Sequence, residues 1–148
     1  MRIASIVAST PILALVAACS QPAEDEAAAA ASEGTAALSG EAGFATAANC
    51  YAQLGAVSRL FSAIAEQSSG AERQDLADRA VSREFAANQY QLLANRLAGE
   101  IGQSAEVTDQ AFKQAEAAVE REFNAREFED FAVWVGEQAD QCPPPDIG

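Results

Sequence analysis

The chain contains no histidine, and its 148 residues include only nine lysines and arginines against 22 aspartates and glutamates. Without histidine there can be no Ser-His-Asp triad, no histidine-ligated metal site and no histidine-ligated haem. The formal net charge of −13 argues against nucleic acid as a partner, because each neutralised phosphate requires a cationic side chain. The same charge argues against adsorption to anionic lipid through a basic patch.

Large apolar side chains are also scarce. Hydrophobic residues make up 49% of the sequence, but 36 of them are alanine, which contributes only a methyl group. From Gly43 onward, 25 residues are valine, isoleucine, leucine, phenylalanine, tryptophan or tyrosine. A chain of this length and composition can build one small core, and therefore one domain.

The first 18 residues have the features of a secretion signal. One positive charge, at Arg2, precedes a mostly apolar run that ends in small residues. The uninterrupted apolar stretch, residues 11–18, is far shorter than the roughly 20 residues of a spanning helix. We therefore assign residues 1–18 to a signal peptide that lies outside the fold. An ordinary signal cleaved after Ala17 or Ala18, or a short membrane anchor, is the alternative.

Residues 16–19 read Val-Ala-Ala-Cys, an aliphatic residue and two small residues before a cysteine. This tetrapeptide resembles the lipobox of bacterial lipoproteins. The resemblance implies that Cys19 carries a thioether-linked lipid, that cleavage occurs before it, and that its new amino group is acylated. It also implies a lipid-anchored protein of the cell envelope, and Ser20 after the cysteine favours the outer membrane, facing the periplasm, over the inner membrane. The match covers only the targeting segment.

Residues 19–42 join this cysteine to an acidic, alanine-rich segment in which Leu38 is the only large apolar residue. Ordering such a segment would bury too little apolar surface to offset the entropy that is lost. We therefore expect a disordered tether, which as a coil would span roughly 25–30 Å.

Residues 43–148 form the expected helical domain, because apolar residues recur there at intervals of three and four. In chain order, the four apolar stripes contain Ala47, Cys50, Leu54, Val57, Phe61 and Ile64; Leu76, Ala80, Val81, Phe85, Tyr90, Leu93 and Leu97; Phe112, Ala115, Val119 and Phe123; and Phe128, Phe131, Trp134 and Val135. Turn residues 68–70 separate the first two stripes, and prolines 143–145 end the last. The fold class predicted from this pattern is all-α.

The number of helices depends on whether the chain breaks near Asn124. The apolar spacing lengthens to five between Phe123 and Phe128, and Asn124 can begin a new helix. Against a break, Glu122 and Arg126 stand four residues apart, as they would on one continuous helix. Three long helices and four shorter ones are therefore both compatible with the local pattern.

The cysteines favour four helices. If Cys19 is lipidated, Cys50 and Cys142 remain as a pair in an oxidising compartment. A disulfide requires Cα atoms within about 7 Å. In a three-helix bundle these residues would lie at opposite ends, whereas in an up-down-up-down four-helix bundle they are neighbours. We therefore predict a small four-helix bundle closed by a Cys50–Cys142 disulfide, with three long helices as the alternative.

Carboxylates are the only abundant reactive groups. They crowd one region of the sequence, at Glu116, Glu120, Glu122, Glu127, Glu129 and Asp130. Paired carboxylates can hydrolyse glycosides, but these are interleaved with Arg121 and Arg126, as on a solvated helix face. The chain also lacks a Gly-x-Ser-x-Gly element, a phosphate loop and an EF-hand. We predict no catalytic residue, no cofactor and no metal site, so the protein is not expected to be an enzyme.

The aromatic residues Phe128, Phe131 and Trp134 are the candidate interaction surface. Their spacing is that of a core-facing stripe, but residues 131–135 are apolar all round, so one side can face a partner. The expected function is a non-catalytic, lipid-anchored envelope protein that acts as a helical interaction module, with a basic envelope protein as the favoured partner. The alternative is a bundle that binds a small apolar ligand or lipid. A carboxylate-based hydrolase ranks last.

Overall fold

The computed structural model describes residues 38–145, which form four α-helices and, within this range, no strand. The helices are α2 (Gly40–Gln67), α3 (Gly70–Glu100), α4 (Ala105–Ala125) and α5 (Phe128–Asp140). The predicted all-α fold with four helices is confirmed. The prediction placed the start of the domain at Gly43, but α2 begins at Gly40 and Leu38 is already buried in the core.

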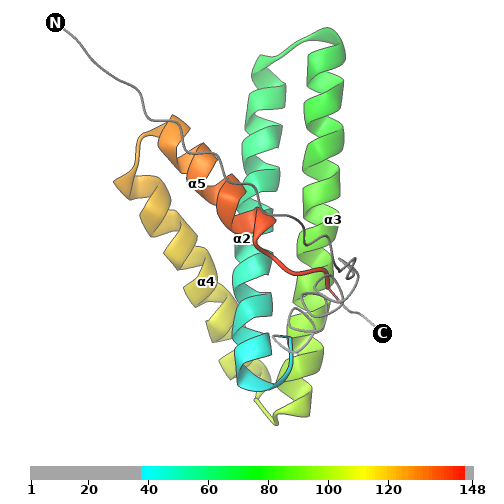
Figure 1. Cartoon of the computed structure of the whole chain (residues 1–148), viewed down its shortest axis with the longest axis vertical. Helices are drawn as coiled ribbons and strands as arrows, with labels where there is room; N and C mark the ends of the chain where they lie inside the picture. The colour runs from blue at the N-terminus through cyan, green and yellow to red at the C-terminus, as the bar shows by residue number, and fades with distance from the viewer. Residues whose placement is uncertain (1–37, 146–148) are drawn as a thin grey trace, which may run out of the picture.

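Helix α2 is the central element of the bundle. It forms a long antiparallel hairpin with α3, and the shorter hairpin of α4 and α5 packs against α2 (Figure 1). Helix α3 makes few contacts with α4. The α2–α3 hairpin extends beyond the α4–α5 hairpin at the end that carries the turn at Ser68 and Ser69 (Figure 1).

The chain reverses direction close to Asn124, so the alternative of three long helices is wrong. Helix α4 ends at Ala125, Arg126 is extended with φ −120° and ψ 155°, and α5 begins at Phe128. The Arg126 side chain still reaches back to Glu122, with Nη2 2.7 Å from Oε2. The ion pair that favoured a continuous helix therefore forms without one.

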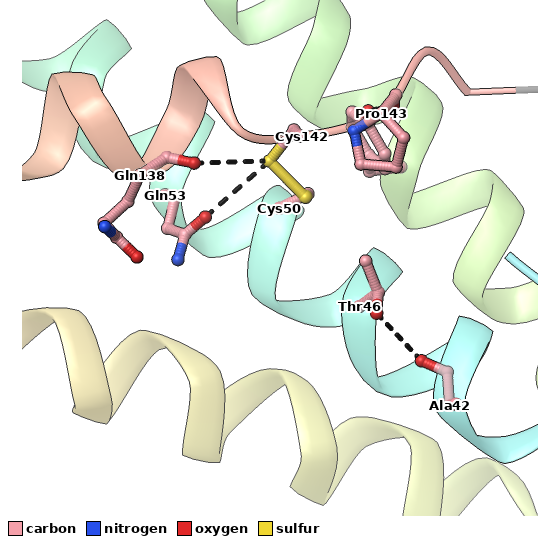
Figure 2. The surroundings of a disulfide bond; sticks show 8 residues. Ala42, Thr46, Cys50, Gln53, Gln138, Cys142 and Pro143 are labelled. Carbon is pink, nitrogen blue, oxygen red and sulfur yellow. Dashed lines mark hydrogen bonds between the residues drawn. A yellow bond between two sulfur atoms is a disulfide. The ribbon is translucent and has the colours of Figure 1, made fainter. Parts of the chain in front are cut away.

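The end of α5 is fastened to both helices of the long hairpin. Cys142 is bonded to Cys50 of α2 (Figure 2), and the two Cα atoms lie 5.8 Å apart. The Tyr90 hydroxyl of α3 donates to the carbonyl oxygen of Pro143, and Arg83 Nη2 lies 3.1 Å from Asp140 Oδ1. Burial raises the pKa of the Tyr90 phenol above its ordinary value. The predicted disulfide is thus present and closes the bundle.

Alanine makes the close packing of α2 and α3 feasible. Half of the buried apolar residues are alanine, including Ala47 and Ala94, which are both fully buried. Small side chains let helix backbones approach closely. The buried Ser58 hydroxyl of α2 can therefore donate to the backbone carbonyl of Ala80 in α3, at 2.9 Å. The largest fully buried side chains are Leu93, Leu97 and Val135.

A second close approach, between the backbone at Leu38 and α2, requires glycine at position 43. The Leu38 backbone folds back over it, so a Cβ at position 43 would clash with the Leu38 carbonyl carbon. We expect Gly43→Ala to lower the free energy of unfolding by about 1–3 kcal/mol, because the start of α2 must shift. The matched control is Gly55→Ala, whose Cβ would meet only Arg59 Nη1 at 3.5 Å. That variant should gain about 0.5–1 kcal/mol of helix propensity. Urea denaturation measures both, and equal shifts would contradict the close approach.

Candidate functional site

An apolar groove of about 560 Å³ runs between α2 and the α4–α5 hairpin. Three helices contribute to it, so it exists only because the chain reverses after α4. Its apolar lining comes from Leu60, Ala63, Val119, Phe123, Phe128 and Phe131.

The phenylalanines divide into a floor and a rim. Phe131 is only 5% exposed and forms the floor. Phe123 packs edge-on against it, with ring centroids 5.1 Å apart and planes at 82°. Phe123 and Phe128 are 49% and 51% exposed, so each keeps about half of a large aromatic surface in solvent. Apolar exposure of this kind, gathered beside a groove, is typical of an interaction site.

The polar rim of the groove is formed by Arg59, Glu116 and Glu120. Glu116 Oε1 accepts a hydrogen bond from the Tyr51 hydroxyl at 3.3 Å, and Tyr51 packs edge-on against Phe112. Burial, and then the charge of Glu116, raise the pKa of Tyr51. Within residues 38–145, neither Arg59 nor Glu120 forms an ion pair. The rim thus offers two carboxylates, one turn apart on α4, against one guanidinium.

The predicted aromatic surface separates in the structure. Phe128 faces the groove and solvent, whereas Phe131 is buried in the core and meets the groove only at its floor. Trp134 is half-buried, and the Arg126 guanidinium lies 5.2 Å from its ring centroid. Trp134 does not line the groove. The cause is helical geometry, since residues three apart on a helix are rotated by about 60° from one another, so the three side chains face in different directions.

The acidic cluster of α4 and α5 is spread over the surface of the two helices. Its members are exposed except Glu122, which is half-buried and paired with Arg126. In the part of the chain that the structure describes, no three histidine, cysteine, aspartate or glutamate side chains lie close enough to hold a metal ion. What this cluster provides is the negative charge on the groove rim.

Several groove residues were not singled out by the sequence. Leu60 falls outside the first apolar stripe, and Phe123 and Val119 were assigned to the core of their helix. The sequence feature that sets Phe123 apart is its spacing of five positions from Phe128, where three or four would continue the helix. Phe123 and Phe128 flank the chain reversal, and both line the groove.

No family model, curated protein or solved structure matches this chain. Among residues 38–145, none of the helices combines the length and apolar character needed to span a bilayer. The predicted lipidation site, Cys19, lies outside the described residues.

Proposed function

We propose that this protein is a non-catalytic, lipid-anchored component of the cell envelope whose helical domain binds a partner protein in the groove between α2 and the α4–α5 hairpin. The observation that carries the proposal is the exposure of Phe123 and Phe128 beside an apolar groove of about 560 Å³. In a domain with so few large apolar residues, two half-exposed phenylalanines on one groove are costly unless they are covered by a partner.

The anchor in this proposal is Cys19, in the Val-Ala-Ala-Cys tetrapeptide that resembles a lipobox. The outer membrane, facing the periplasm, is the proposed location. Residues 20–37 would connect the anchor to the start of the described domain at Leu38. This arrangement holds the groove at a membrane surface while the domain itself stays in water.

The chemistry of the groove indicates the kind of partner. Its floor is apolar, and its length follows two helices, which suits an amphipathic helix lying in the groove. Glu116 and Glu120 on the rim, within a chain of net charge −13, favour lysine or arginine beside the apolar face of that helix. We therefore propose a basic, amphipathic segment of another envelope protein.

A small apolar ligand or lipid is the second candidate. The volume of the groove falls within the range of about 300–1,000 Å³ that small-molecule sites occupy. Against it, Phe123 and Phe128 remain half-exposed, so an apolar ligand would leave one side in water. The carboxylates of the rim would also repel the head group of a fatty acid.

Binding of a designed peptide tests the proposal. The mature chain carrying Cys19→Ser is titrated with a synthetic amphipathic helix that has leucine on one face and lysine on the other. A matched peptide carries glutamate in place of lysine. We expect the lysine peptide to bind at least about tenfold more tightly, a difference of about 1.4 kcal/mol in binding free energy. Loss of the rim charge in Glu116→Gln/Glu120→Gln should reduce that preference.

Two serine variants locate the binding. Phe128→Ser should weaken the lysine peptide at least about tenfold, because it removes half of the apolar rim. Val133→Ser, at a side chain that is 63% exposed elsewhere on α5, should have no effect. Equal effects of the two variants, or equal affinity for both peptides, would overturn the proposal. Saturable, Phe128-dependent binding of palmitate without peptide binding would instead support the second candidate.

A further inference from the structure

The outer face of α3 carries a second apolar surface that the groove does not use. Val81, Phe85 and Leu92 are 65%, 64% and 64% exposed, and among the described residues no large apolar side chain is more exposed. Their spacings of four and seven residues put them on one stripe of the helix. We call Val81, Phe85 and Leu92 the α3 stripe.

The bundle itself cannot cover the α3 stripe. The residues by which α3 meets the core, such as Tyr90, Leu93 and Leu97, lie on the opposite side of the helix. The α4–α5 hairpin packs on α2, and α3 makes few contacts with α4. The stripe is therefore an unpartnered helix face on the part of the chain that the structure describes.

Charged residues frame the stripe in a self-complementary way. Asp78 precedes Val81 by three residues, and Arg96 follows Leu92 by four. Asp78 and Arg96 are 18 residues apart, which is about five helical turns, so they lie on the same flank of the stripe. Arg96 already lies 3.7 Å from Glu100, through an exposed pair of the kind that contributes little stability.

We propose that two copies of this chain pair through α3, antiparallel and about a two-fold axis near Asn88. About such an axis, a given flank of the helix in one copy lies beside the same flank of the helix in the second copy. Asp78 of one copy therefore meets Arg96 of the second copy, and Arg96 of the first copy meets Asp78 of the second. The same register sets Val81 against Leu92 and places the two Phe85 side chains next to the axis. One register therefore satisfies the apolar and the charged positions together, as an isologous interface requires.

The size of the α3 stripe fixes the strength of the pairing. Three large apolar side chains per copy bury far less than the roughly 1,200 Å² of a standard stable interface. The dimer is therefore weak in dilute solution. Holding both copies at a membrane, as the proposed function has it, raises their effective concentration and favours pairing. The pairing surface itself does not depend on the groove.

Disulfide trapping in the full-length, membrane-associated chain tests the pairing. Asn88→Cys places a thiol beside the proposed axis, and oxidation should give a covalent dimer on a non-reducing gel. Gln74→Cys lies near one end of the same helix, where the antiparallel arrangement holds the two copies of position 74 about 40 Å apart. It should give at least tenfold less dimer. Equal trapping at both positions would indicate parallel or random contact and would overturn the proposal, as would no trapping at Asn88→Cys.

Charge reversal tests the register. In the Asn88→Cys background, Asp78→Arg and Arg96→Asp should each reduce the dimer at least fivefold, because like charges then oppose each other at both ends. The double variant should restore it, and failure to restore it would overturn the register. Phe85→Ser should abolish trapping and leave peptide binding in the groove unchanged, whereas Phe128→Ser should do the opposite. The two proposals therefore fail independently.

Discussion

Replacing Cys50 and Cys142 together by alanine is expected to lower the free energy of unfolding by about 4–5 kcal/mol. The disulfide joins residues that are 92 apart in the sequence. In the chain-entropy model, closing a loop of this length destabilises the unfolded chain by about that amount. For a domain of this size the loss corresponds to a fall in Tm of roughly 15–20 °C. The loss is a large share of the total stability, because half of the buried apolar residues are alanine and add little hydrophobic stabilisation.

Circular dichroism during heating measures this effect. A reducing agent should lower the Tm of the native chain by nearly the same amount and leave the double alanine variant unchanged. Alkylation of the unsubstituted protein under denaturing, non-reducing conditions should detect no free thiol at positions 50 and 142. Two reactive thiols there, or a Tm that does not respond to reduction, would contradict the closure of the bundle by this bond.

The second large effect concerns Cys19. Cys19→Ser is expected to move the protein from the membrane fraction almost entirely to the soluble fraction, and to remove the added lipid mass from its N-terminal peptide. A single acyl chain binds membranes only marginally, but several together give stable anchoring, so removing their attachment site removes nearly all of the membrane affinity.

The variant Cys50→Ala/Cys142→Ala controls for general effects of cysteine loss, because it should remain with the membrane. Fractionation of expressing cells, followed by mass spectrometry of the N-terminal peptide, gives both readouts. If Cys19→Ser fractionates like the native chain and the native peptide carries no lipid, the anchor is refuted while the groove remains to be tested.

The helical fold was predictable because its signals agree with one another. Apolar spacing located all four helices, and the Ser104 hydroxyl caps α4 by accepting a hydrogen bond from the Val107 amide at 3.3 Å. The break near Asn124 could not be decided locally, since the Glu122–Arg126 pair forms in either case. The disulfide decided it, because only a chain reversal brings Cys142 beside Cys50. One long-range constraint therefore settled what the local pattern left open.

Helical spacing does not reveal which of two apolar faces meets the core. Val81 and Phe85 were assigned to the same stripe as Leu93 and Leu97, yet they lie on the outer side of α3. The core side of α3 carries alanines, among them Ala87, as well as Leu93 and Leu97. In an alanine-rich chain the large apolar residues are therefore a poor guide to the buried face.

The groove could not be foreseen because it depends on the angle between helices. Phe123 and Phe128 stand on opposite sides of the turn between α4 and α5, and the sequence gives no measure of how far that hairpin leans from α2. Leu38 was missed for a similar reason. It is an isolated leucine in a polar segment, and only its fold-back over Gly43 makes it part of the core.

The central claim is that a protein partner occupies the groove, and photo-crosslinking from position 128 tests it most directly. A photoreactive phenylalanine analogue replaces Phe128 in the full-length chain in intact cells, and Val133 in the control. We predict a protein adduct from position 128 that is absent from position 133 and is lost in the Glu116→Lys/Glu120→Lys background. Adducts of equal yield from both positions, an adduct that survives reversal of the rim charge, or an adduct with lipid alone would contradict the account.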